Sequence, residues 1–150
     1  MAHLRKATVE DLNHVCQNLR VMDKIEAWYQ TGYQPEDAVK ITYISAKKNL
    51  AIAGDEDQPM GLCGVCHDGC IWMVGTDELF SQKRHRLHLI RKGRAWVNSL
   101  LTTNDILYNH VYAENVSAIK WLKALGFTFI NFHPEYGHLN KPFYEFVRIA

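Results

Sequence analysis

Four residues that can bind a metal or attach a cofactor lie within eight positions: Cys63, Cys66, His67 and Cys70. The spacing Cys-x-x-Cys-His is that of covalent haem attachment, and three thiols with an imidazole also suit zinc. Haem attachment needs an exported chain, but residues 1–12 are charged and lack the apolar core of a signal peptide. Within one strand, Cys63 and Cys66 point to opposite faces, which opposes zinc binding. We therefore expect reduced, buried thiols in a protein that is not secreted, with neither haem nor a metal.

A second segment whose side chains could bind a ligand is strongly basic. Its members are Lys83, Arg84, His85, Arg86, His88, Arg91, Lys92 and Arg94. Such side chains can hold phosphate oxygens, which would suit a pyrophosphate or a nucleotide. They spread around a helix without interleaved aromatic residues, so nucleic acid is a disfavoured partner. A solvated helix face and an acidic protein partner stay open as alternatives.

The composition is that of an ordinary globular chain. With 150 residues, 47% of them hydrophobic and 22% charged, we expect one domain over residues 1–150 with a sizeable core. The formal net charge of +1 gives no whole-chain attraction to nucleic acid or to a membrane surface. No apolar run approaches the roughly 20 residues that a membrane-spanning helix needs. A membrane span is therefore not expected.

The elements that must position these residues follow from apolar periodicity. The pattern predicts strands at residues 4–8, 49–55, 62–66, 70–74, 106–113, 127–132 and 143–149, and helices at 8–22, 23–33 and 115–125. Pro35 is expected to open a short helical turn. Residues 76–102 are predicted to form mostly one long helix with Phe80, Leu87 and Ile90 on one face. The order indicates an α/β (α+β) fold with a mixed sheet and helices on both faces.

One stretch, Asn115–Phe127, is more specific than the pattern as a whole. A strand precedes it, Asn115 or Ser117 can cap its helix, and Gly126 stops the helix before a further strand. This arrangement resembles the closing signature of the GNAT superfamily of acyl-CoA-dependent N-acyltransferases. The element order is also similar to that of GNAT domains over nearly the whole chain. The resemblance implies a central, mostly antiparallel sheet with helices on both faces, and acetyl-CoA or CoA as the cofactor.

The resemblance also implies where a cofactor would bind. GNAT proteins hold the CoA pyrophosphate at the start of their long helix with a Q/R-x-x-G-x-G/A loop, whose N–H groups and helix dipole favour an anion. The matching residues here are Gln82, Lys83, Arg84, His85, Arg86 and Leu87. His85 and Leu87 replace the glycines and obstruct close backbone approach, while the cations could hold phosphates instead. The backbone of Met73, Val74 and Gly75 would bind the pantetheine arm, with Asn115 nearby.

Only some of the catalytic positions of GNAT proteins have a matching residue in this sequence. In the superfamily a Tyr seven positions after the motif Asn often reprotonates the CoA thiolate, and here that position is Leu122. Tyrosines that could substitute for it are Tyr108, Tyr112, Tyr136 and Tyr144. Candidate general bases are Glu26, Glu114 and His110, the last with a structural role as the alternative. Asn115 joins them as the motif residue that caps the helix and fixes the loop.

A narrower resemblance is carried by Cys70–Leu79, Leu107–Gly126 and Pro142–Arg148. These stretches look like those of a GNAT-like family of short-tailed bacteriophages that includes an internal virion protein related to DNA ejection. The resemblance implies acyl transfer from acetyl-CoA to a primary amine, such as one on a protein. It equally implies a non-catalytic virion, assembly, ejection or host-protein-binding factor. Either protein would be found in the host cytoplasm or the virion, and a simple small-molecule or nucleotide binder is the third alternative.

Overall fold

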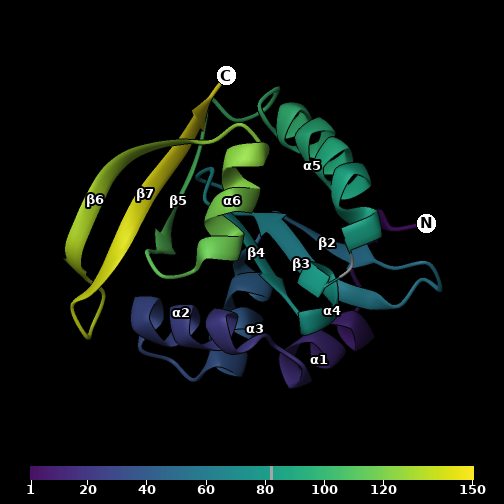
Figure 1. The fold of residues 1–150 in the computed structure, drawn as a ribbon, viewed down its shortest axis with the longest axis horizontal. Coiled ribbons are helices and arrows are strands. Elements are labelled where there is room, and N and C mark those ends of the chain that lie inside the picture. Colours follow the sequence, from purple (N-terminus) through teal and green to yellow (C-terminus); the bar gives the residue numbers. More distant parts are fainter. Residues whose placement is uncertain (82) are drawn as a thin grey trace.

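The computed structural model describes residues 1–81 and 83–150, and of Arg84 only the backbone. Its elements run in the order β1 (His3–Lys6), α1 (Val9–Gln17), α2 (Val21–Thr31), α3 (Pro35–Ser45), β2 (Lys48–Ala53), β3 (Pro59–Val65), β4 (Ile71–Gly75), α4 (Asp77–Ser81), the 3₁₀ helix η1 (Lys83–His85), α5 (Arg86–Leu100), β5 (Ile106–Tyr112), α6 (Val116–Ala124), β6 (Thr128–Tyr136) and β7 (Lys141–Ile149) (Figure 1). The expected mixed fold of antiparallel strands and helices is confirmed. No helix in this described part is long and apolar enough to cross a membrane.

The strands form two sheets where one was expected. The first has the order β1-β2-β3-β4 and the second β5-β7-β6, and all pairs within them are antiparallel. Between the two sheets, the described residues include one parallel bridge, from Cys70 just before β4 to Tyr108 of β5, with the Tyr108 N–H donating to Gly69 O at 3.1 Å. Beyond that bridge the two strands separate. The sheets therefore meet at one end and open at the other.

The core lies on both faces of the first sheet. Leu12 and Val15 of α1 pack with Ala51 and Leu62, whereas Leu89 of α5 packs on the opposite face with other strand residues, namely Ile52, Met60 and Cys63. The neighbours Ala51 and Ile52 thus serve opposite faces, as do Leu62 and Cys63, as the two-residue repeat of a strand requires. Met60 departs from this repeat because a register irregularity lies beside it. In Figure 1 helices α1, α2 and α3 lie on one side of the strands and α5 on the other.

The long helix predicted for residues 76–102 is wrong as a continuous element. The chain instead forms α4, then η1, then α5 starting at Arg86. Leu79 and Leu89 are both buried in one core cluster. In an uninterrupted helix their directions would differ by about 80°, so the tighter turn between them brings both to the core. Leu87, expected on the apolar face, is 69% exposed.

Several helix ends confirm the expected local chemistry, and some differ. Thr8 forms a capping box with Asp11, and Gly32 ends α2 with a left-handed φ of 75°. The first helix ends at Gln17, earlier than predicted, and Pro35 begins a full helix of 11 residues. Asn115 occupies the N-cap of α6 without a capping hydrogen bond, because its side chain is bonded elsewhere.

Candidate functional site

A cleft lies where β4 and β5 separate. Its volume is about 380 Å³, and its lining includes residues of β4, β5, α2, α3, α5 and α6. The Asn109 side chain crosses between the strands and donates to Ile71 O at 2.7 Å. Gln30 of α2 in turn donates to the Asn109 side-chain oxygen at 3.2 Å. Two amide side chains therefore connect the two sheets and α2 within the cleft.

The backbone of β4 is only partly available to a ligand. The Gly75 N–H donates to the buried Asp23 carboxylate at 2.8 Å, and Gly75 O accepts from the Arg20 N–H at 2.9 Å. Successive residues of a strand direct their backbone groups to alternate sides. Met73 therefore faces the same side as Gly75, while Val74 directs its groups to β3. Of the three residues expected to bind pantetheine, Met73 is thus the one whose backbone faces the cleft side without a hydrogen bond to Arg20 or Asp23.

A buried polar network lies where α2, the last residue of β4 and the start of α6 meet, a region called here the inner end of the cleft. The Arg20 guanidinium donates to Asp23 at 3.0 Å and to the Asn115 side-chain oxygen at 2.9 Å. The same guanidinium lies 4.0 Å from the centre of the Phe80 ring. Asn115 is 1% exposed and Asp23 6%. Asn115 thus ties α6 to α2.

Glu26 joins this inner network from the next turn of α2. Its carboxylate accepts the Tyr112 N–H at 2.6 Å, and the side chain lines the cleft. Burial raises the pKa of Glu26 to about 8, and the negative charge of Asp23 contributes to the rise. A carboxyl with that pKa can exchange a proton near neutral pH. Glu26 therefore has the position and the pKa of a candidate general base.

The other two predicted bases contact different groups. Glu114 is exposed and accepts a hydrogen bond from the Tyr112 hydroxyl, which raises the pKa of Tyr112 to about 12. His110 stacks on Tyr136 with ring centres 4.4 Å apart. Its Nε2 lies 3.6 Å from Glu145, and burial lowers the pKa of His110. The structure therefore brings Glu26 and Asn115 together, but it groups His110 with other residues.

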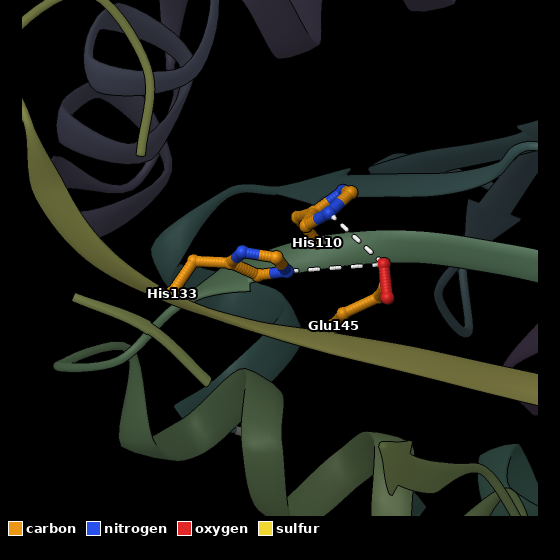
Figure 2. Close-up of side chains that lie close together, drawn as sticks. All are labelled: His110, His133 and Glu145. Atoms are coloured by element: carbon orange, nitrogen blue, oxygen red, sulfur yellow. Dashed lines mark ion pairs between the residues drawn. The ribbon is translucent and has the colours of Figure 1, made fainter. Parts of the chain in front are cut away.

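His110 belongs to a cluster that sequence reasoning missed. His133 and Glu145, on β6 and β7, direct their side chains toward His110 (Figure 2). The three residues lie far apart in sequence, and no local motif connects them. Strand register alone could have revealed them, because Glu145 lies directly opposite His110 in the sheet.

The region called here the outer end lies next to this network, because the Phe80 ring that contacts Arg20 also lines its pocket. The predicted pyrophosphate residues in this region have different surroundings. Lys83 and Arg86 line a small pocket of about 60 Å³ beside Phe80 and Trp121. His85 is 7% exposed, with its Nε2 3.5 Å from Asp55. Gln82 and the Arg84 side chain lie outside the described residues. The turn leads directly from η1 into α5, without a glycine and without a side-chain cap.

The position of the usual proton donor is apolar. Leu122 is half-buried and packs in the core beneath the second sheet. Two of the four candidate tyrosines, Tyr108 and Tyr112, donate their hydroxyl to a carboxylate. Tyr108 donates to Asp68 at 2.5 Å, Tyr112 to Glu114, and Tyr144 packs on Phe129. Tyr136 is the ring that stacks on His110.

The cysteines adopt the arrangement expected of structural thiols. Cys63 is buried, Cys66 and Cys70 are half-buried, and His67 is exposed on the hairpin turn. Burial raises the pKa of both Cys63 and Cys70 to about 12, so these thiols stay protonated at neutral pH. Within residues 1–81 and 83–150, the group of three that could hold a metal contains none of these four residues.

Comparison with known sequences points to bacteriophages. The family described as "Bacteriophage T7, probable scaffold protein Gp13" matches residues 49–137. The probable scaffold protein gp13 of Escherichia phage T7 is 34% identical over 82 residues, covering 52% of this chain. That alignment covers 54% of the T7 protein, so the chain spans about half the length of this relative.

Comparison with solved structures gives the fold. Spermidine N-acetyltransferase from Vibrio cholerae, in complex with CoA and spermine, aligns with a TM-score of 0.70 at 15% identity, over 99% of this chain and 95% of that one. A single-residue mutant of the same Vibrio cholerae enzyme aligns with a TM-score of 0.69 at 16% identity, over 99% and 93%. These neighbours are GNAT-fold acetyltransferases, so this chain has the GNAT fold. At sequence identities this low, the structural similarity establishes the fold but not an enzymatic activity.

Proposed function

This chain belongs to the family of the bacteriophage T7 probable scaffold protein Gp13, and we propose that it is a non-catalytic GNAT-fold component of phage assembly. In this role it acts through contacts with other phage or host proteins, in the host cytoplasm or in the virion. The observation that carries the proposal is the outer end of the cleft, where His85 and Leu87 occupy the positions at which GNAT proteins carry glycine.

A CoA pyrophosphate needs N–H groups that its oxygens can approach closely. Here the Leu87 side chain is 69% exposed at the start of α5, and His85 is turned inward beside Asp55. Lys83 lies in the 3₁₀ helix that replaces an open loop. The cations Lys83 and Arg86 lie at the surface, where a single ion pair contributes little free energy. The outer end therefore supports CoA binding weakly.

The inner end supports the same proposal. The backbone N–H and C=O of Gly75 are hydrogen-bonded to Asp23 and Arg20, so they are not available to bind a pantetheine arm. Leu122 cannot protonate a leaving thiolate. A scaffold-type role needs a rigid fold and a surface, and this buried network supplies the rigidity.

The test is mass spectrometry of purified virions and of assembly intermediates from infected cells. We expect the protein in at least one of these particles at a fixed stoichiometry. A virion signal would favour an internal virion component, and a signal in intermediates alone would favour a transient scaffold. Absence from both would contradict the assembly role.

Acyl transfer is the second candidate, because Glu26 has a pKa near 8 and lines the cleft. Glu26 as the carboxylate would take a proton from an amine, whose nitrogen would then attack the thioester carbonyl carbon. The carbon–sulfur bond would break, and CoA would leave as a thiolate. The solved neighbours suggest polyamines as acceptors beside protein amines, since one of them is a spermidine N-acetyltransferase in complex with spermine.

This second candidate has its own assay. Purified protein, acetyl-CoA and either spermidine or a lysine peptide are incubated, and acetylated product is measured by mass spectrometry. Product formed by the wild type and lost in Glu26→Gln would establish transfer and overturn the non-catalytic proposal. If neither acceptor gives product at protein concentrations high enough for single turnover, the hypothesis of acetyl transfer to these acceptors is rejected.

A further inference from the structure

Three strands of the second sheet bring together two imidazoles and a carboxylate. His110 of β5 lies directly opposite Glu145 of β7. His133 of β6 lies two residues beyond Asn131, the residue opposite Glu145, and on the same face. Diagonal neighbours of this kind are within reach of long side chains. Figure 2 shows both rings directed toward the Glu145 carboxylate.

The distances within this cluster are close to those of a metal site. Glu145 Oε1 lies 3.6 Å from His110 Nε2 and 3.8 Å from His133 Nε2. One ligand atom from each residue falls within 4.8 Å of the others. Zinc bonds of about 2.0–2.2 Å in a tetrahedron place ligand atoms about 3.3 Å apart. The two distances to the carboxylate would each shorten by a few tenths of an ångström, and the separation of the two imidazole nitrogens, at most 4.8 Å, would close by up to about 1.5 Å through ring rotation.

We propose that His110, His133 and Glu145 bind one divalent transition-metal ion of the zinc class. Two imidazoles and one carboxylate are ligands that zinc and its neighbours accept, whereas magnesium and calcium prefer all-oxygen sets. The proposal departs from our expectation that the chain binds no metal. It does not depend on the assembly role.

An unpartnered nitrogen supports this assignment. The Nε2 atom of His133 is buried from solvent and has no hydrogen-bond partner among the residues that the structure describes. At 3.8 Å it lies beyond hydrogen-bonding distance from Glu145. A buried polar atom without a partner is costly, and an ion between the two groups would satisfy it.

Neighbouring residues hold the three ligands in place. Asn131 donates to the second carboxylate oxygen of Glu145 at 3.0 Å, which leaves Oε1 directed at the two rings. The Tyr136 hydroxyl lies 3.4 Å from His110 Nδ1, and its ring stacks on the imidazole. Outer partners of this kind orient the ligands of metal sites. The cluster therefore has both ligands and supports.

Three protein ligands leave a fourth position open. The exposed fractions of the side chains are 18% for His110, 23% for Glu145 and 39% for His133, so the cluster reaches the surface. Water or a side chain of a partner protein can supply the fourth ligand of the ion there. The ion would also cross-link β6 to its neighbours beside the register irregularity between His133 and Tyr136.

The test is calorimetric titration of Zn²⁺ into chelator-treated, dialysed protein, followed by Co²⁺ absorption spectroscopy. We expect one ion per chain. His133→Ala should weaken Zn²⁺ binding by about 100-fold or more, and Asn131→Ala by about 10-fold, the size typical of losing a residue that orients a metal ligand. The Co²⁺ spectrum should show nitrogen and oxygen ligands without a sulfur charge-transfer band.

The matched control is His14→Ala, because His14 is exposed on α1 and remote in sequence from all three ligands. It should bind Zn²⁺ like the wild type. Circular dichroism and thermal unfolding without metal verify that each variant folds, and Asn131→Ala remains informative if His133→Ala does not. No binding at millimolar Zn²⁺, equal affinity in the folded ligand variants, or a sulfur-ligated Co²⁺ spectrum would overturn the proposal.

Discussion

Two neighbouring regions beside the cleft between β4 and β5, the inner end and the outer end, differ in burial and in bonding. At the inner end Arg20, Asp23 and Asn115 are buried and bonded to one another across three elements. At the outer end Lys83 and Arg86 lie around a small surface pocket. The inner end preserves the separation of strands that defines the fold. The GNAT architecture is therefore present here together with a turn before α5 that contains no glycine.

The largest effect is expected from Asp23→Ala at the inner end. The substitution leaves the buried Arg20 guanidinium without its carboxylate and removes the acceptor of the Gly75 N–H. Breaking a buried pair on one side typically costs about 3–5 kcal/mol, and urea unfolding should show a loss of this size. The control Asp105→Ala, at an exposed position, should change stability by less than about 0.5 kcal/mol. Equal stabilities of the two variants would show that the inner network is not a structural unit.

The next effect is a pH dependence caused by Glu26. Its pKa rises from 4.5 to about 8 on folding, so the unfolded chain loses this proton at lower pH than the folded chain does. Stability from this carboxyl is therefore fully present below about pH 4.5 and falls as pH rises to about 8. Each unit is about 1.4 kcal/mol, and solvent screening of the partly exposed side chain reduces the total to about 2–3 kcal/mol.

Glu26→Gln should remove that dependence. Urea unfolding of both proteins between pH 5 and 9 measures it, with the stability difference growing in favour of Gln as pH rises. The difference between the two curves cancels the titration of His110 and of the cysteines, which both chains share. Parallel curves would mean that Glu26 is an ordinary surface carboxylate and a poor candidate for a base.

A smaller effect is expected from Asn109→Ala, which removes the side chain that crosses the cleft. The lost hydrogen bond to Ile71 O should cost about 1 kcal/mol. Hydrogen exchange should speed up at the ends of β4 and β5 nearest the cleft, while β2 keeps its protection. Unchanged exchange in β4 and β5 would show that other contacts hold the strands.

The smallest effect is expected at the outer end. Lys83 and Arg86 are exposed, so Lys83→Ala combined with Arg86→Ala should alter the unfolding free energy by less than about 0.5 kcal/mol per site. Thermal unfolding measures this directly. A loss of unfolding free energy as large as that of Asp23→Ala would show that the outer end is as important for stability as the inner end.

Much of the fold could be predicted because its signals are local. The Thr8 capping box, the turn glycines Gly32 and Gly126, and the Asp68-Gly69 hairpin each act within a few residues. The break before α5 could not be predicted, since it follows from the shared burial of Leu79 and Leu89. That burial depends on the sheet beneath them.

The candidate site was predictable to a lesser degree. Glu26 and Asn115 were identified by residue type and motif, but the bond between Asn115 and Arg20 spans 95 positions. Likewise, His133 joins His110 only through the pairing of both their strands with β7. Contacts of this length depend on register and topology, which a single sequence specifies only weakly.

The measurement that tests the central claim most directly is calorimetric titration of the protein with CoA and acetyl-CoA. Because the turn before α5 contains no glycine, the proposal predicts no saturable heat at millimolar ligand and no thermal shift. Saturable one-to-one binding, weakened by Arg86→Ala, would contradict it. That result would return the protein to the acyl-CoA-dependent enzymes whose fold it shares.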